Sequence, residues 1–189
     1  MRRAVFSLLF GSLVPLITKA QFRENYDRYA SAWVRSEKSD KQLPANLKST
    51  GTQLQLVIPE NDRFFEMPNG NRFLRAYLIN NTSGKTIIYR ADATVSSITT
   101  EILVDGEWKI LQTHMASECG NSYWKKTLAP KRFLELDIDF MIDGLVEVQY
   151  RICYNTPGYK VTSNPVALKI KEELVRSADT IPTYAESGF

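Results

Sequence analysis

Residues 98–112 read ITTEILVDGEWKILQ, and they contain the clearest fold signal in the chain. Two runs rich in β-branched and apolar residues flank Asp105-Gly106, a pair that tolerates the positive φ angles of a type I′ turn. Such a turn joins two antiparallel strands because its twist matches theirs. The stretch therefore predicts a β-hairpin with strands at Ile98–Val104 and Glu107–Gln112.

The same two-residue period continues on both sides of this hairpin. Among the alternating segments are Leu54–Ile58, Phe73–Asn80, Lys85–Arg90, Phe133–Phe140 (FLELDIDF), Leu145–Tyr154 and Val166–Ile170. Turn residues separate these segments, and no helical pattern lies between them. We therefore expect an all-β fold over residues 52–170, an antiparallel immunoglobulin-like β-sandwich of about seven or eight strands. A closed barrel is the structural alternative, because periodicity does not distinguish the two.

The two ends of the chain have a different character from this strand-rich region. Six residues follow helical spacing: Phe22, Tyr26, Tyr29, Ala30, Trp33 and Val34. They predict a short N-terminal amphipathic helix, followed by a polar linker, within residues 21–51. Residues 171–189 are expected to form a polar C-terminal tail.

The first twenty residues match a secretory signal peptide. Arg2 and Arg3 precede an apolar run from Ala4 to Ile17, and a small-residue exit at Ala20 precedes Gln21. The run is shorter than the roughly 20 residues that span a bilayer. We expect residues 1–20 to be removed, which leaves no transmembrane span in the mature chain. The expected location is the periplasm, the cell surface or the extracellular space of a bacterium.

The charge of the mature chain argues against nucleic-acid binding. The full chain carries 24 Lys and Arg against 21 Asp and Glu. Cleavage would remove Arg2, Arg3 and Lys19 and would bring the two counts level. Nucleic-acid binding requires a basic face that offsets phosphate charge, and neither the balance nor the spacing of the cations supplies one.

Two cysteines, Cys119 and Cys153, remain in a chain that we place in an oxidising compartment. An even count there favours one disulfide bond, and two buried free thiols are the alternative. A structural zinc site is not expected, since His114 is the chain's one histidine and no fourth ligand is evident. We expect neither a metal nor a cofactor.

Short sequence features between residues 73 and 170 also carry a family resemblance. They are Asn80-Asn81-Thr82, Asp105-Gly106-Glu107-Trp108, Cys119-Gly120-Asn121-Ser122-Tyr123, Leu128-Ala129-Pro130 before Leu134-Glu135-Leu136, Tyr150–Tyr154 and Ser163-Asn164. In these features the chain resembles small exported bacterial immunoglobulin-like or fibronectin-type-III-like domains, a family that is mostly uncharacterised. The resemblance implies a β-sandwich and no specific activity. Trp124 follows Cys119 by five residues, which departs from the antibody pattern of a core Trp between paired Cys.

No catalytic constellation is evident, so we do not expect an enzyme. His114 lies in a polar stretch without a nucleophile-elbow pattern, and we interpret it as an exposed loop or edge-strand histidine. Asp137, Asp139 and Asp143 are conceivable acid, base or calcium groups. If Leu134, Leu136, Ile138 and Phe140 point inward, Asp137 and Asp139 share the outward face of FLELDIDF, which we expect to be solvated.

Binding is the favoured class of function. Exposed aromatic residues stack on sugars or anchor protein partners, and the candidates are Trp108, Tyr123, Trp124 and Tyr159. The main hypothesis is a binding or assembly module of the bacterial envelope, whose partner is another envelope or extracellular protein met through loops or by strand addition at an open edge. The alternatives are a carbohydrate-binding module and a proteinase-inhibitor-like domain.

The export hypothesis makes a prediction about secreted material. Intact-mass analysis should find a chain that begins at Gln21, and digestion without reduction should yield a peptide that links Cys119 to Cys153. Retention of Met1 would overturn the export hypothesis, and free-thiol labelling of both cysteines would reject the bridge.

Overall fold

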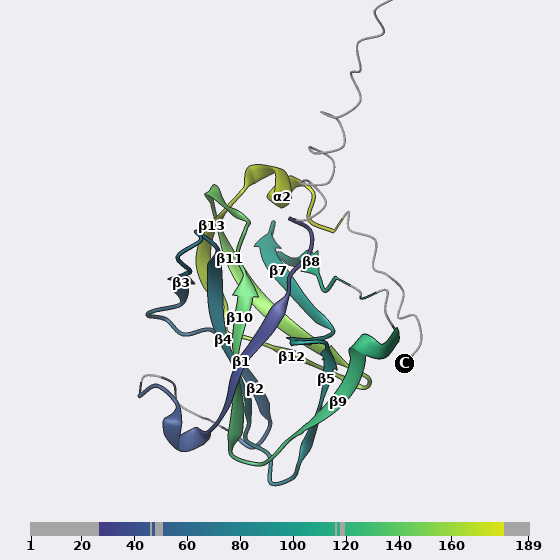
Figure 1. Ribbon diagram of the computed structural model, residues 1–189. Helices are drawn as coiled ribbons and strands as arrows, with labels where there is room; N and C mark the ends of the chain where they lie inside the picture. Colours follow the sequence, from purple (N-terminus) through teal and green to yellow (C-terminus); the bar gives the residue numbers. More distant parts are fainter. Residues whose placement is uncertain (1–26, 46, 48–50, 116, 118–119, 180–189) are drawn as a thin grey trace, which may run out of the picture.

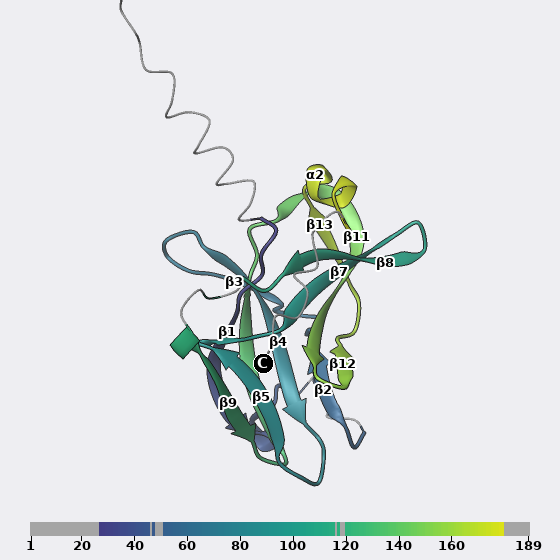
Figure 2. The same cartoon turned by 90° about the vertical axis from the view of Figure 1, so that its right-hand side faces the viewer.

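The computed structural model describes residues 27–45, 47, 51–115, 117 and 120–179. Over these residues the chain folds into two antiparallel sheets that pack face to face (Figure 1, Figure 2). The predicted all-β sandwich is confirmed, and the barrel alternative is not observed because the two sheets are separate. No helix among the described residues has the length and apolar character needed to cross a bilayer.

The larger sheet has eight strands. In spatial order they are β2 (Leu54–Val57), β4 (Arg72–Asn80), β10 (Arg132–Asp139), β1 (Ala32–Ser39), β6 (Thr94–Val95), β5 (Thr86–Ala91) and β9 (Tyr123–Leu128), and β3 (Phe64–Glu66) pairs with the start of β4. β10 pairs along its whole length with β4 on one side and from Arg132 to Ile138 with β1 on the other. It is therefore an interior strand of the sheet.

The smaller sheet has five strands and contains the predicted hairpin. Its order is β12 (Tyr159–Thr162), β11 (Asp143–Thr156), β7 (Ile98–Val104) and β8 (Glu107–Thr113), and β13 (Val166–Ile170) also pairs with β11. Asp105 and Gly106 have φ angles of 54° and 82°, as a type I′ turn requires. Two 3-10 helices, η1 (Asp40–Gln42) and η2 (Gly120–Ser122), and the helix α2 (Glu172–Arg176) complete the described elements.

Four alternate residues of FLELDIDF point into the core, as the alternation predicts, whereas Phe133 is buried in a second, smaller cluster with Tyr77 and Ile79. Leu134, Leu136 and Ile138 are fully buried and Phe140 is 3 % exposed. They belong to one cluster that also includes Tyr150 and other residues of the smaller sheet. Burial of this apolar area is the main favourable contribution to the stability of a sandwich.

The N-terminal helix prediction is wrong over the residues that the structure describes. Ala32–Ser39 is strand β1, which lies between β10 and β6 in the larger sheet. Ala32 is fully buried and Val34 packs against the core, whereas Trp33 is 44 % exposed. Phe22 and Tyr26, like the predicted signal peptide, lie outside the described residues.

A physical reason for this difference is that the segment fits two periods. Ala32 and Val34 alternate with Trp33 and Arg35, which is typical of a strand. Tyr29, Ala30, Trp33 and Val34 have the spacing of a helix face. A short helix gains little from its own hydrogen bonds in water. Pairing with β10 and β6 satisfies the backbone of β1 and buries its apolar face, so tertiary structure overrides the local pattern.

Residues 171–179 also differ from the expected polar tail, because they form a short helix and pack against the fold. In and just after α2, Leu174 and Ala178 pack against the hydrophobic core. The backbone amide of Asp179 then donates to the carbonyl of Ile110, and its carboxylate accepts from the amide of Ile110, at 3.0 and 2.9 Å. The segment thereby covers part of the outer edge of β8.

The predicted disulfide bond falls partly outside the described residues. Cys119 is not described, and Cys153 is a buried free thiol on β11. Burial and the nearby charge of Glu101 raise the pKa of this thiol to about 11. The bridge therefore remains a prediction.

A tight backbone contact near the start of β11 generates a stability prediction. Gly144 lies in a β-bulge between Asp143 and Val146, and a Cβ added there would collide with the backbone of Ile170. Gly144→Ala should lower the free energy of unfolding by about 2 kcal/mol, since overpacking forces the backbone to shift. Chemical denaturation measures this loss. Gly84→Ala is the matched control because a Cβ added at Gly84 would have open space around it, and equal stability of the two variants would contradict the prediction.

Candidate binding site on the eight-stranded sheet

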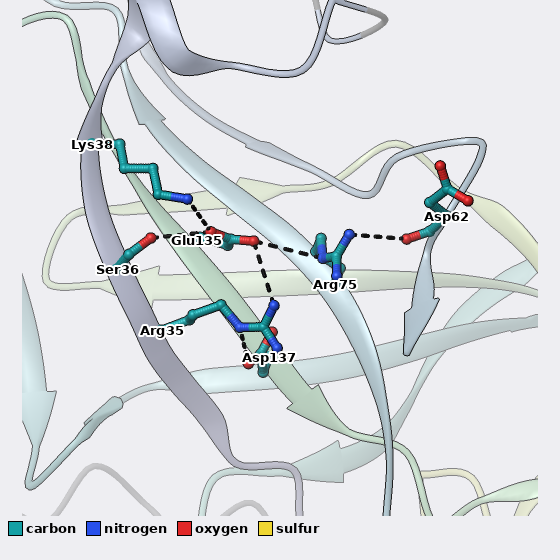
Figure 3. Close-up of polar contacts among 7 residues, drawn as sticks. All are labelled: Arg35, Ser36, Lys38, Asp62, Arg75, Glu135 and Asp137. Carbon is teal, nitrogen blue, oxygen red and sulfur yellow. Dashed lines mark hydrogen bonds and ion pairs between the residues drawn. The ribbon is translucent and has the colours of Figure 1, made fainter. Parts of the chain in front are cut away.

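The outer face of the larger sheet carries a buried charge cluster centred on β10. We define the β10 charge cluster as Arg35, Ser36, Lys38, Arg75, Glu135 and Asp137 (Figure 3). Its side chains come from β1, β4 and β10, three adjacent strands of the sheet. The cluster lies on the side of the sheet opposite to the hydrophobic core.

A β-bulge in β1 brings two of these side chains to β10. Val34 faces Leu136 across the ladder and Ser36 faces Glu135, so Arg35 is an extra residue without an opposite partner. Bulges of this kind redirect a side chain and are frequent next to functional sites. Here the bulge allows Arg35 and Ser36 to reach neighbouring carboxylates on β10.

Glu135 is buried, and cations surround its carboxylate. Its Oε2 accepts hydrogen bonds from Ser36 at 3.0 Å and Lys38 at 2.9 Å. The guanidinium groups of Arg75 and Arg35 lie 3.7 and 3.9 Å away. Burial acts to raise the pKa of Glu135, but the hydrogen bonds from Lys38 and Ser36 and the charges of Lys38 and Arg35 outweigh it, so this pKa lies below its ordinary value.

Asp137, two residues further along the strand, is only half satisfied. Oδ2 accepts from Nε of Arg35 at 2.9 Å. Oδ1 is buried and has no hydrogen-bond partner among the described residues. Burial is the largest effect and raises the pKa of Asp137 above its ordinary value, despite the opposing charge of Arg35. A buried polar oxygen without a partner destabilises the fold and calls for an explanation.

Asp139 fixes the orientation of Trp33. The indole Nε1 lies 3.2 Å from both carboxylate oxygens of Asp139. The Trp33 ring is thus held by its polar edge while 44 % of the residue stays exposed. A rigid aromatic side chain of this kind offers contact area at a small entropic cost. Burial raises the pKa of Asp139, and the hydrogen bond from Trp33 opposes this rise.

These groups surround a hollow on the sheet face. The hollow has a volume of about 270 Å³ and is lined by Trp33, Arg35, Phe65, Met67, Phe73 and Asp137. Phe65 and Phe73 stack with a centroid distance of 5.1 Å, and the Arg35 guanidinium lies 4.1 Å from the Phe65 ring centre. We call this feature the Trp33 hollow. It combines an apolar, aromatic wall with one cation and one carboxylate.

The aromatic residues predicted to bind a ligand lie at separate places and do not line the Trp33 hollow. Trp108 is half-buried on β8, and the guanidinium of Arg151 lies 4.0 Å from its ring centre. Arg151 in turn pairs with Glu101, which also pairs with Lys160. Trp108 is therefore part of a stack on the outside of the smaller sheet.

The other three predicted aromatics occupy strands at the edges of the sheets. Trp124, on β9, is 45 % exposed, donates to the carbonyl of Asp92 and lies against Arg90. Tyr123, beside it, accepts a hydrogen bond from the backbone of Ser117. Tyr159 begins β12, the edge strand of the smaller sheet, and is 48 % exposed. The structure does not bring Tyr159 together with Trp124 or Trp108.

Two sequence expectations about polar residues need correction. Asp137 does share the outward face of β10, but it is 9 % exposed rather than solvated, because β1 and β4 side chains cover it. His114 is half-buried instead of exposed, and its Nε2 lies 3.1 Å from the hydroxyl of Thr94. Burial lowers the pKa of His114. Asp143 is exposed and pairs with Arg72.

The chemistry that the Trp33 hollow can offer follows from the residues that line it. Among the described residues no three His, Cys, Asp or Glu side chains lie close enough to hold a metal ion. Asp137 is the one carboxylate that lines the hollow, and no hydroxyl, thiol or imidazole lines it. The hollow offers stacking surface, a hydrogen-bond acceptor and a cation.

Sequence reasoning misses Trp33, Arg35, Phe65, Met67 and Phe73 as site residues. The first two fall within the helical pattern, and the three-residue strand β3 is too short to give a periodic signal. A usable signal does exist, because the small apolar residues Ala32 and Val34 alternate with the larger Trp33 and Arg35, as on the two faces of a strand. The acidic residues of FLELDIDF then require cations on neighbouring strands.

No protein family matches the chain, and no curated protein or solved structure is significantly similar to it. The immunoglobulin-like resemblance of the sequence therefore remains a prediction.

The pKa values of Glu135 and Asp137 are shifted in opposite directions, which generates a stability prediction. At pH 7, Glu135→Gln should lower the free energy of unfolding by about 2 kcal/mol, because it removes a buried charge that is well paired. Asp137→Asn should leave stability unchanged or raise it, because the ionised carboxylate is disfavoured by burial. Urea denaturation of both variants measures the difference.

The pH dependence has a defined sign for each residue. The pKa of Glu135 is lowered from 4.5, so its contribution is present above pH 4.5 and is lost as the pH falls through the folded-state pKa. The pKa of Asp137 is raised from 3.8, so the folded state gains stability as the pH falls through that raised pKa. The prediction fails if Asp137→Asn is the more damaging change at pH 7.

Proposed function

We propose that the chain is a non-enzymatic binding module whose ligand contacts the outer face of the eight-stranded sheet at the Trp33 hollow. The observation that carries this proposal is the buried Oδ1 of Asp137, which has no partner among the described residues and belongs to a side chain that lines the hollow. A ligand that donates a hydrogen bond there would remove the cost of this unpaired oxygen. Natural proteins tolerate such local costs at functional sites.

The aromatic wall supports the same proposal. Trp33 and Met67 are each 44 % exposed and line one hollow. Clustered exposed apolar residues around a few polar groups are typical of binding sites. Trp33 is also held in place by Asp139 before any ligand arrives, which reduces the entropy lost on binding.

The sheet face is a better candidate than an open sheet edge. The outer edge of β8 is occupied, since Thr113 exchanges backbone hydrogen bonds with Arg28 and Ala30 and the amide of Asp179 donates to Ile110. β9 remains an edge strand of the larger sheet, but it carries Lys125 and Lys126. Lysines on an edge strand discourage pairing with another strand. Strand addition at β8 or β9 is thus less well supported than contact through the Trp33 hollow.

The proposed setting follows from the sequence. If residues 1–20 act as a signal peptide, the module works outside the cytoplasm, at the envelope or beyond it. The partner is then a protein or a glycan of that environment. A level charge balance after cleavage is consistent with a ligand that is not strongly charged.

The three tryptophans provide a direct test of this binding face. In ¹H–¹⁵N NMR spectra Trp33, Trp108 and Trp124 each give one indole signal. Titration with phenol or cyclohexanol, two small rings with one hydroxyl, should shift the Trp33 signal far more than the other two. Trp124 is the matched control because it is equally exposed and lies on the same sheet.

A preferential shift of the Trp124 or Trp108 signal would move the binding face elsewhere and contradict the proposal. Equal small shifts of all three signals would also contradict it, because they would indicate contact without a site.

A further inference from the structure

We propose that the Trp33 hollow binds one ring of a neutral carbohydrate. This inference rests on the proposed function and names the class of its ligand. The size of the hollow, its polar groups and its charge each support it.

The size of the hollow suits one small ring. Pockets that hold drug-sized ligands have volumes of roughly 300–1,000 Å³, and the Trp33 hollow has about 270 Å³. A single sugar ring falls in this smaller class. One face of such a ring is made of C–H groups and can lie on the exposed indole of Trp33, as apolar groups do on aromatic side chains.

The polar groups of the hollow match hydroxyls. Asp137 lines the hollow, and its Oδ1 lacks a donor among the described residues. This oxygen is buried, so a hydroxyl donates to it once the carboxylate turns toward the hollow. Arg35 keeps 38 % of its side chain exposed although its Nε is used by Asp137, and its remaining N–H groups can donate to hydroxyl oxygens. A sugar ring carries hydroxyls that both donate and accept, next to an apolar face. An aliphatic side chain of a protein partner would bury Asp137 without supplying a donor.

The charge around the hollow favours a neutral ligand. The cations Arg35, Lys38 and Arg75 are balanced by the carboxylates of Glu135, Asp137 and Asp139. Each of these cations already forms an ion pair with Glu135 or Asp137, at 2.9 to 3.9 Å. An anionic ligand would meet the carboxylate of Asp137, and a cationic ligand would meet the guanidinium of Arg35. Burial of an unpaired charge on either ligand is costly.

The test uses the full mature chain and two sets of probes. D-glucose, D-galactose, D-mannose and N-acetylglucosamine are titrated against the indole signals of Trp33 and Trp124. N-acetylleucinamide, which imitates an aliphatic side chain, is titrated in parallel. At least one neutral sugar should shift the Trp33 signal selectively, and N-acetylleucinamide should not.

Affinity electrophoresis in gels that contain neutral polysaccharides then tests the individual residues. Xylan, galactomannan, laminarin and hydroxyethylcellulose serve as neutral probes, and alginate serves as the acidic one. Trp33→Ala and Asp137→Leu should each weaken retardation by about tenfold in apparent affinity, the scale of a binding hot spot. Trp33→Phe keeps an aromatic face and should retain most of the binding. Trp124→Ala should bind like the wild type.

Several outcomes would overturn the inference. If no neutral sugar shifts the Trp33 signal selectively, or if Trp124→Ala loses retardation while Trp33→Ala keeps it, the ligand class is wrong. A selective shift by N-acetylleucinamide instead would leave the binding face intact and assign it to a protein partner. A shift of the Trp33 signal that depends only on protein concentration would assign it to a second copy of the chain.

Discussion

The structure depends on the neutralisation of buried carboxylates on the outer face of β10. The inner face of this strand is apolar and buried, and β10 lies inside the eight-stranded sheet, between β4 and β1. Its outward Glu135 and Asp137 are then covered by the neighbouring strands. Charges in such a position are tolerated only when they are paired, and Lys38, Arg35 and Arg75 supply the pairs. The pairing of β10 with β1 and β4 therefore brings the cations to the carboxylates, and these ion pairs in turn favour that pairing.

The same constraint creates the candidate site. The bulge that brings Arg35 to Asp137 leaves Trp33 on the outer face, opposite Asp137 in the ladder. Asp139 then holds the indole, and Phe65 from β3 stacks under Arg35. Glu135 accepts two hydrogen bonds and faces three cations, whereas Oδ1 of Asp137 has no hydrogen-bond partner among the described residues. This contrast within one strand marks Asp137 as the position where we expect a ligand.

Much of the fold is predictable from local patterns, whereas the site is not. The turn at Asp105-Gly106 requires positive φ angles, which few residues adopt easily. The alternation of FLELDIDF allows only one face of the strand to be buried in the core. Both predictions are therefore correct. The segment around Trp33 satisfies two periods, and only its pairing with β10, about a hundred residues away, decides between them. The surroundings of Trp108 are not predictable for a similar reason, since the Arg151 that covers its ring comes from another strand.

The Trp33 hollow requires β1 to be a strand paired with β10. Nuclear Overhauser effects across the ladder test this pairing most directly, because Val34 and Leu136 face each other in it. We predict strong contacts between the backbone protons of β1 and β10, together with slow exchange of the β1 amides. Contacts between residues three apart within Tyr29–Ser36, typical of a helix, would contradict the strand and, with it, the Trp33 hollow.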